Sequence, residues 1–147
     1  MGGQAQEWTL QLETALPSPP ERVFAAFLDP VGVTEWFGPA GYRATSVEID
    51  SRQGGQYRIT MQPLEGDVFH ISGDFHEIEP PHRLVYSFVY EQPGPDDRET
   101  VVTVTFEPDG EGTRLVLDQR TFETEDRLEL HRAGWADTLE RLAQALA

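Results

Sequence analysis

The stretch that decides the fold runs from Phe69 to Tyr90 and reads FHISGDFHEIEPPHRLVYSFVY. Apolar and polar residues alternate from Phe69 to Phe75 and again from Leu84 to Tyr90, which is typical of strands with one buried face. Pro80 and Pro81 interrupt the pattern, because proline has no amide hydrogen to donate to a neighbouring strand. The stretch therefore predicts two antiparallel strands joined by a short connection.

The same alternation continues on both sides of this hairpin. Short turns built from glycine and acidic residues, such as Gln53–Gly55 and Asp109–Gly112, separate the alternating runs. The residues expected on one face of these further strands are Trp8, Leu10, Leu12, Val47, Ile49, Tyr57, Ile59, Met61, Val102, Val104, Phe106, Leu115, Leu117 and Gln119. We therefore predict seven antiparallel strands, one at the N-terminus and six between residues 44 and 122.

Three helices are predicted around these strands. The sequence Ser18-Pro19-Pro20-Glu21 suggests a helix capped by Ser18, which ends at Asp29-Pro30, and a second short helix is expected over Val31–Trp36. After the last strand, Thr124 is a suitable cap for a long helix. Its apolar face recurs at steps of three or four residues and contains Leu128, His131, Trp135, Leu139, Leu142 and Leu146. A helix of about 20 residues is long enough to cover one face of the sheet.

Several motifs resemble the family named for the activator of the Hsp90 ATPase. They are the Ser18–Pro39 segment with its Trp36-Phe37-Gly38-Pro39 ending, the turn Asp50–Gly55, the run Gly73–Tyr86, and the short motifs Gly112–Leu115 and His131–Trp135. The resemblance covers roughly residues 8–146 and implies a single α+β domain over 1–147 with the helix-grip, START-like fold. In that fold, a seven-stranded antiparallel sheet wraps on a long C-terminal helix, with two short helices after the first strand.

Composition narrows the function. The chain of 147 residues has no cysteine and no lysine, and its net charge is −15. The absence of cysteine excludes disulfides, thiol nucleophiles and thiolate zinc sites, and the absence of lysine excludes Schiff-base chemistry. The negative charge disfavours nucleic acid and anionic membranes as partners.

No apolar run approaches the roughly 18 residues of a membrane span, so no membrane insertion is expected. No signal peptide is recognisable, so a cytoplasmic location is expected, with residues 1–6 as a flexible tail.

The face of the sheet that points to the long helix is rich in aromatic residues with few polar groups among them. Such a surface is typical of a pocket for a small apolar or amphipathic molecule, but by the residues alone it is more often a filled core. The resemblance favours the pocket, because members of the superfamily bind lipids, sterols and polyketides between sheet and helix. The expected ligand-binding residues are Trp36, Phe37, Tyr57, Met61, Phe75, Tyr86, Phe88, Gln119, His131 and Trp135.

His131 is the one histidine expected inside, and no inward carboxylate is evident to orient it. It is a candidate catalytic base, or a residue that satisfies one hydrogen bond in the core. His70 and His76 share one strand but lie roughly 20 Å apart at about 3.3 Å per residue, so no metal site is predicted. No cofactor is expected, and Asp50 is expected to pair with Arg52 beside the turn at Gly54-Gly55.

Three functions remain open at this level. The chain binds a small hydrophobic molecule, or it is a cyclase- or hydratase-type enzyme that uses His131 with a tyrosine hydroxyl, or it is a chaperone-associated protein of the stress response. An Hsp90-type chaperone is itself acidic, and the charge of −15 argues against that partner. A homodimer is compatible with all three functions.

Overall fold

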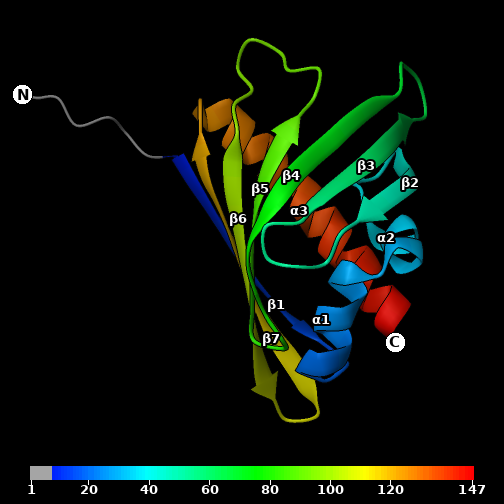
Figure 1. Ribbon diagram of the computed structural model, residues 1–147, viewed down its shortest axis with the longest axis vertical. Coiled ribbons are helices and arrows are strands. Elements are labelled where there is room, and N and C mark those ends of the chain that lie inside the picture. The colour runs from blue at the N-terminus through cyan, green and yellow to red at the C-terminus, as the bar shows by residue number, and fades with distance from the viewer. Residues whose placement is uncertain (1–7) are drawn as a thin grey trace, which may run out of the picture.

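The computed structural model describes residues 8–147 and contains one curled sheet with three helices (Figure 1). The elements are β1 (Trp8–Leu16), α1 (Pro20–Leu28), α2 (Pro30–Trp36), β2 (Tyr42–Ile49), β3 (Gln56–Pro63), β4 (Phe69–Glu79), β5 (Arg83–Tyr90), β6 (Thr100–Asp109), β7 (Gly112–Phe122) and α3 (Glu125–Leu146). The strand order is β1-β7-β6-β5-β4-β3-β2, and every neighbouring pair is antiparallel. The predicted seven strands and three helices are confirmed.

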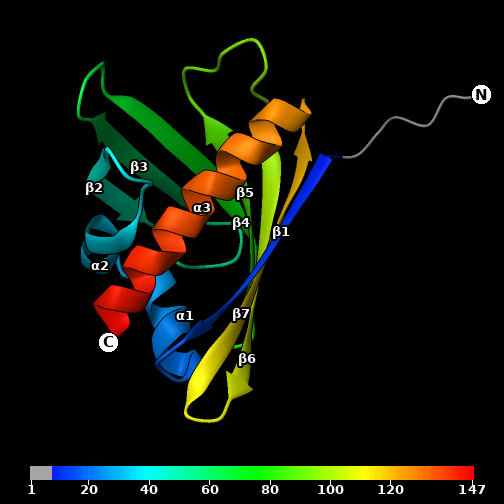
Figure 2. The same cartoon turned by 180° about the vertical axis from the view of Figure 1, so that it is seen from behind.

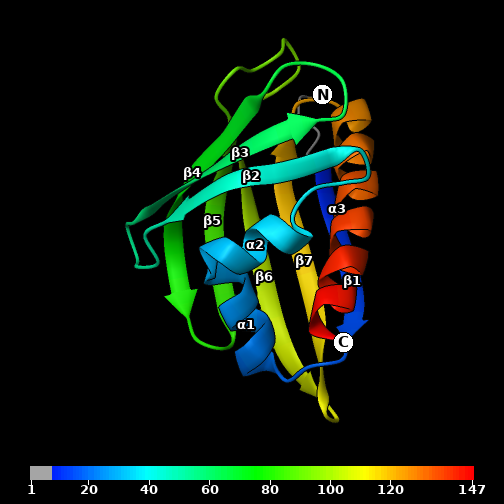
Figure 3. The same ribbon diagram turned by 90° about the vertical axis from the view of Figure 1, so that its right-hand side faces the viewer.

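Helix α3 lies diagonally across the inner face of the sheet (Figure 2). Its buried residues are Leu128, Trp135, Thr138, Leu139, Leu142 and Leu146, which adds Thr138 to the predicted apolar face. Helices α1 and α2 occupy one end of the space between α3 and the sheet (Figure 3). There Phe24 and Phe27 of α1 pack edge-on against Phe106, with ring centroids 5.2 and 5.4 Å apart. Among the described residues no short helix lies at the opposite end of the sheet, and this asymmetry determines where open space remains.

A close approach between β4 and β5 shapes the middle of the sheet. Gly73 has room for no side chain, because a Cβ atom there would overlap the backbone of Ser87 and the ring of Tyr57. The Tyr57 hydroxyl reaches across to donate to the carbonyl oxygen of Ser87 at 2.7 Å. The Ser87 hydroxyl accepts from the Asp74 amide at 2.8 Å. Ser87 is consequently buried, although strand alternation places it on the solvent side of β5.

Helix capping follows the prediction at one helix and departs from it at another. The Thr124 hydroxyl accepts from the Arg127 amide at 3.1 Å, as expected of the α3 cap. The prediction that Ser18 caps α1 is wrong, because Pro19 occupies the cap position and Pro20 begins the helix. The Ser18 hydroxyl instead donates to the carbonyl oxygen of Leu146, in the last turn of α3, at 3.1 Å.

Two smaller predictions have different outcomes. Asp50 and Arg52 form the predicted ion pair, with the two side-chain atoms 2.8 Å apart. Glycine is required at the turn they flank, because a Cβ atom on Gly55 would overlap the carbonyl oxygen of Asp50. The predicted flexible tail at residues 1–6 lies outside the described residues.

Candidate functional site

A mostly apolar cleft with a volume of about 390 Å³ lies between α3 and the strands β2 to β5, and we refer to it as the main cleft. This volume falls within the range of small-molecule sites, roughly 300–1,000 Å³. Aromatic and aliphatic side chains make most of its wall. The lining residues are Phe37, Pro39, Tyr42, Met61, Phe69, Ile71, Phe88, Tyr90, Arg127, Leu130, His131, Ala133, Gly134, Trp135, Asp137 and Thr138. The cleft follows α3 from Arg127 to Thr138, which corresponds to about 16 Å of helix at 1.5 Å per residue.

The structure divides the ten predicted site residues into three groups. Phe37, Met61, Phe88, His131 and Trp135 line the main cleft. Trp36, Tyr57, Phe75 and Tyr86 line a separate hollow of only about 40 Å³ beneath α2, to which Phe37 and Phe88 also contribute. All four of these side chains are buried. Gln119 lines neither space.

Gln119 is completely buried and orders the helix side of the cleft. Its side-chain oxygen accepts from the indole N–H of Trp135 at 2.7 Å, and its amide nitrogen donates to the Thr100 hydroxyl at 2.8 Å. The Trp135 ring also meets Phe37 edge-on, with centroids 6.1 Å apart. Trp135 is thus held in one orientation as part of the cleft wall.

One end of the cleft, near the start of α3, is polar. The Tyr90 hydroxyl lies 3.1 Å from Nε2 of His131, and the guanidinium of Arg127 stands 5.9 Å from the centre of the Tyr90 ring. Arg127 forms an ion pair with Asp97, with the nitrogen and oxygen 2.6 Å apart. Asp97 belongs to the loop after β5, which lies at the same end of the molecule as the start of α3 (Figures 1 and 2). Asp97 is the carboxylate at this end of the cleft, and it is joined to His131 through Arg127 and Tyr90 rather than by a hydrogen bond of its own.

Burial determines the protonation of this polar end. Burial lowers the pKa of His131 to about 4, and the neighbouring positive charge of Arg127 acts in the same direction. Burial also raises the pKa of the Tyr90 hydroxyl well above its usual value. At neutral pH the pair therefore consists of an uncharged imidazole and an uncharged phenol. Such a pair is able to exchange hydrogen bonds with a polar ligand atom, and the imidazole is able to accept a proton.

The residue-level prediction omitted several lining residues that the sequence does signal. Phe69 begins one alternating run and Tyr90 ends another, and the bulky residues of both runs were expected on the inner face. Arg127 precedes His131 by four residues, so the two share one helix face. Tyr42 and Asp137 carry no comparable signal, because their position depends on how the segment between α2 and β2 meets α3.

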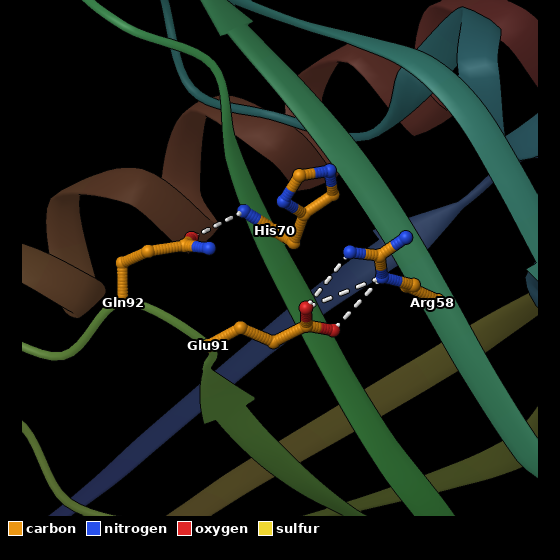
Figure 4. Close-up of polar contacts among 4 residues, drawn as sticks. All are labelled: Arg58, His70, Glu91 and Gln92. Carbon is orange, nitrogen blue, oxygen red and sulfur yellow. Dashed lines mark hydrogen bonds and ion pairs between the residues drawn. The ribbon is translucent and has the colours of Figure 1, made fainter.

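The remaining histidines lie outside the cleft. Figure 4 shows His70 beside the ion pair of Arg58 and Glu91, on the face of the sheet opposite to the lining residues Phe69 and Ile71. Gln92 accepts from the His70 backbone amide at 3.3 Å. His76 and His82 are exposed, and His82 lies in the turn between β4 and β5, as predicted. Among residues 8–147, no group of three or more histidine or acidic side chains is placed to hold a metal ion.

Comparison with known proteins identifies the family. The family model described as "Activator of Hsp90 ATPase homolog 1-like protein" matches residues 17–147. The chain belongs to this family. A crystal structure of a Chromobacterium violaceum protein is 28% identical, with a TM-score of 0.84 over 94% of this chain and 96% of that one. The AHSA1 protein of Silicibacter pomeroyi is 27% identical, with a TM-score of 0.81 and the same coverage, 94% and 96%.

The crystal structure of CalU16 from Micromonospora echinospora is also similar, with 27% identity and a TM-score of 0.71 over 95% of this chain and 76% of that chain. Comparison with curated proteins finds no match. The sheet, the long helix and the two short helices are those of the START-like, helix-grip fold shared by this family, as predicted. Within residues 8–147, none of the helices is long and apolar enough to cross a bilayer.

Proposed function

We propose that this member of the family binds a small apolar or amphipathic molecule in the cleft between α3 and the sheet. The observation that carries the proposal is the cleft itself, with about 390 Å³ of space between mostly aromatic and aliphatic walls. A few polar groups at its ends, including the Tyr90–His131 pair, would orient the ligand. The helix-grip fold supports the proposal, since related folds hold apolar molecules in this position.

The first test is native mass spectrometry of protein purified without detergent, followed by solvent extraction of bound material. A reproducible added mass on the folded chain is the expected result, and its composition would identify the ligand class. A chain that carries no added mass would next be titrated with decanol, a neutral probe with one polar end. Failure of decanol to bind, together with the absence of a native ligand, would contradict the proposal.

A substitution that fills the cleft tests the location. A Cβ atom on Gly134 would come no closer than 3.8 Å to Pro39, so it is tolerated, and because both residues line the cleft a longer side chain there is expected to take up space in it. We expect Gly134→Leu to reduce decanol affinity at least tenfold, while the helix remains folded. Ala136→Leu is the matched control, because Ala136 is an exposed residue of the same helix that does not line the cleft. Equal loss of binding in both variants would place the ligand elsewhere.

A second candidate function is acid–base catalysis within the same cleft, of the cyclase or hydratase type. It is favoured by one observation, the 3.1 Å contact between the Tyr90 hydroxyl and His131. A substrate identified by extraction would be assayed for turnover with His131→Phe, which keeps a ring but has no basic nitrogen, and with Tyr90→Phe. Loss of turnover with unchanged ligand affinity would support catalysis, and full turnover in both variants would exclude a role for this pair.

A further inference from the structure

The charges on the wall of the main cleft are few, and within residues 8–147 only one of them is unpaired. Arg127 and Asp137 are the two residues of opposite charge that line it. Arg127 is neutralised by Asp97 at 2.6 Å, and only 15% of the Asp97 side chain is exposed. His131 adds no charge at neutral pH, because burial keeps its pKa near 4.

Asp137 has no ion-pair partner among the described residues. One of its carboxylate oxygens accepts a long hydrogen bond, 3.3 Å, from the amide of Ala40. Arg141, one helical turn further along, is the natural partner by spacing. However, its guanidinium donates to the carbonyl oxygens of Gly38 at 2.9 Å and Glu35 at 3.2 Å. The carboxylate of Asp137 is therefore available at the end of the cleft opposite to Arg127.

Six aromatic rings stand along the wall between these two ends. They belong to Phe37, Tyr42, Phe69, Phe88, Tyr90 and Trp135. The face of an aromatic ring carries partial negative charge and attracts cations, and Arg127 already stands over the Tyr90 ring in this way. A net charge of −15 adds a long-range field that attracts cations and repels anions.

Resting on the binding function proposed above, we infer that the cleft selects a cationic amphiphile, an organic ammonium ion whose head group pairs with Asp137 and whose apolar part lies among the aromatic side chains. A carboxylate head group is disfavoured at both ends. At the Asp137 end it meets an unpaired negative charge, and at the Arg127 end the charge of the guanidinium is already balanced by Asp97. A neutral alcohol of the same chain length binds with intermediate affinity.

The inference is tested with three probes that share one alkyl chain: decylammonium, decanol and decanoate. Affinities are measured by calorimetry at neutral pH and low salt, below the concentrations at which the probes form micelles. We expect decylammonium to bind at least tenfold more tightly than decanoate, with decanol between them. The preference should shrink when salt is raised to about 0.5 M, where charges are screened over a few ångströms.

Two variants with the same change in net charge locate the counter-ion. Asp137→Asn should remove the preference for decylammonium over decanol. Glu140→Gln should leave the preference intact, since Glu140 is exposed on α3 and does not line the cleft. The cleft-filling variant Gly134→Leu separates cleft binding from adsorption to surface carboxylates, because adsorption would persist in it.

Each outcome has one meaning. Binding of decanoate as tight as that of decylammonium would overturn the charge preference and leave the proposed binding function standing. Equal effects of Asp137→Asn and Glu140→Gln would overturn the role of Asp137. Retention of decylammonium binding in Gly134→Leu would assign it to the surface and overturn the inference. Failure of all three probes to bind would overturn this inference, and only together with the absence of a native ligand would it overturn the proposed function as well.

Discussion

Gln119 links two strands and the long helix through a single buried amide. It receives the indole N–H of Trp135 at 2.7 Å and donates to the Thr100 hydroxyl at 2.8 Å. We predict that Gln119→Leu lowers the free energy of unfolding by about 1–3 kcal/mol, because the buried indole N–H is left without an acceptor. Urea denaturation measures this change.

A second substitution separates the hydrogen bond from packing. In the Gln119→Leu background, Trp135→Phe should cost less than it does in the wild-type chain, since the unpaired indole N–H is removed. Trp135→Ala should cost about 3–5 kcal/mol if the ring is core. Strictly additive effects of Gln119→Leu and Trp135→Phe on the free energy of unfolding would show that the Gln119–Trp135 hydrogen bond contributes nothing to stability.

His131 makes stability depend on pH. Its folded pKa of about 4 lies below the ordinary value of 6.5, because the site is buried and Arg127 is close, while Asp97 opposes the shift. Between pH 4 and 6.5 the unfolded chain therefore binds more protons than the folded chain, so the stability contribution of His131 is complete above that window and is lost as pH falls through it. The full shift corresponds to an upper limit of about 3 kcal/mol at 1.36 kcal/mol per unit.

Comparison with His131→Phe isolates this effect from the other titrating groups. Phenylalanine keeps the ring contacts with Phe88, Tyr90 and Phe122. The wild-type chain should lose stability relative to this variant as pH falls from 6.5 to 4, as followed by urea denaturation at each pH. Parallel pH profiles would show that the imidazole titrates alike in the folded and unfolded chains.

At the scale of elements, Thr124 and Ser18 were both predicted to cap the start of a helix, yet they have different roles at the two ends of α3. Thr124 caps the start of the helix, and Ser18 binds the Leu146 carbonyl in its last turn. We predict that Thr124→Ala costs about 0.5–2 kcal/mol and that Ser18→Ala costs an amount similar to one buried hydrogen bond, about 1 kcal/mol. Hydrogen exchange distinguishes the two, with faster exchange in the first turn of α3 for Thr124→Ala and in its last turn for Ser18→Ala. The opposite pattern would contradict this assignment.

At the scale of the whole molecule, the net charge of −15 opposes folding through self-repulsion. Ion pairs on the sheet surface, such as those of Arg114 with Glu13 and Glu107, act against this repulsion. The side chains of these pairs are about half exposed, so each pair contributes little to the free energy of unfolding. We predict that the midpoint of thermal unfolding rises with NaCl, most steeply below about 0.1 M, where the screening length falls to about 10 Å. A midpoint that falls over this range would mean that attraction between surface charges outweighs repulsion.

The sequence by itself determined the elements, their order and the family, because these depend on local pattern. Alternation in strands such as Leu84–Tyr90, three- and four-residue spacing in α3 and proline at Pro80-Pro81 are all readable from neighbouring residues. The inner face of the sheet followed from the same alternation, and so did Met61 and Phe88 of the main cleft, while His131 and Trp135 followed from the helical spacing of α3.

Only the tertiary structure decided which inward residues face open space. Tyr57 and Tyr86 alternate like Phe88 and Tyr90, yet they lie under α2 in a hollow of about 40 Å³, while Tyr90 reaches the main cleft. The difference arises because α1 and α2 fill one end of the curled sheet and leave the other to side chains of α3. The pairing of Arg127 with Asp97 and the unpaired state of Asp137 likewise depend on segments brought together across 30 to 103 residues of chain. Such contacts leave no periodic trace in the sequence, because each is set by the relative position of whole elements.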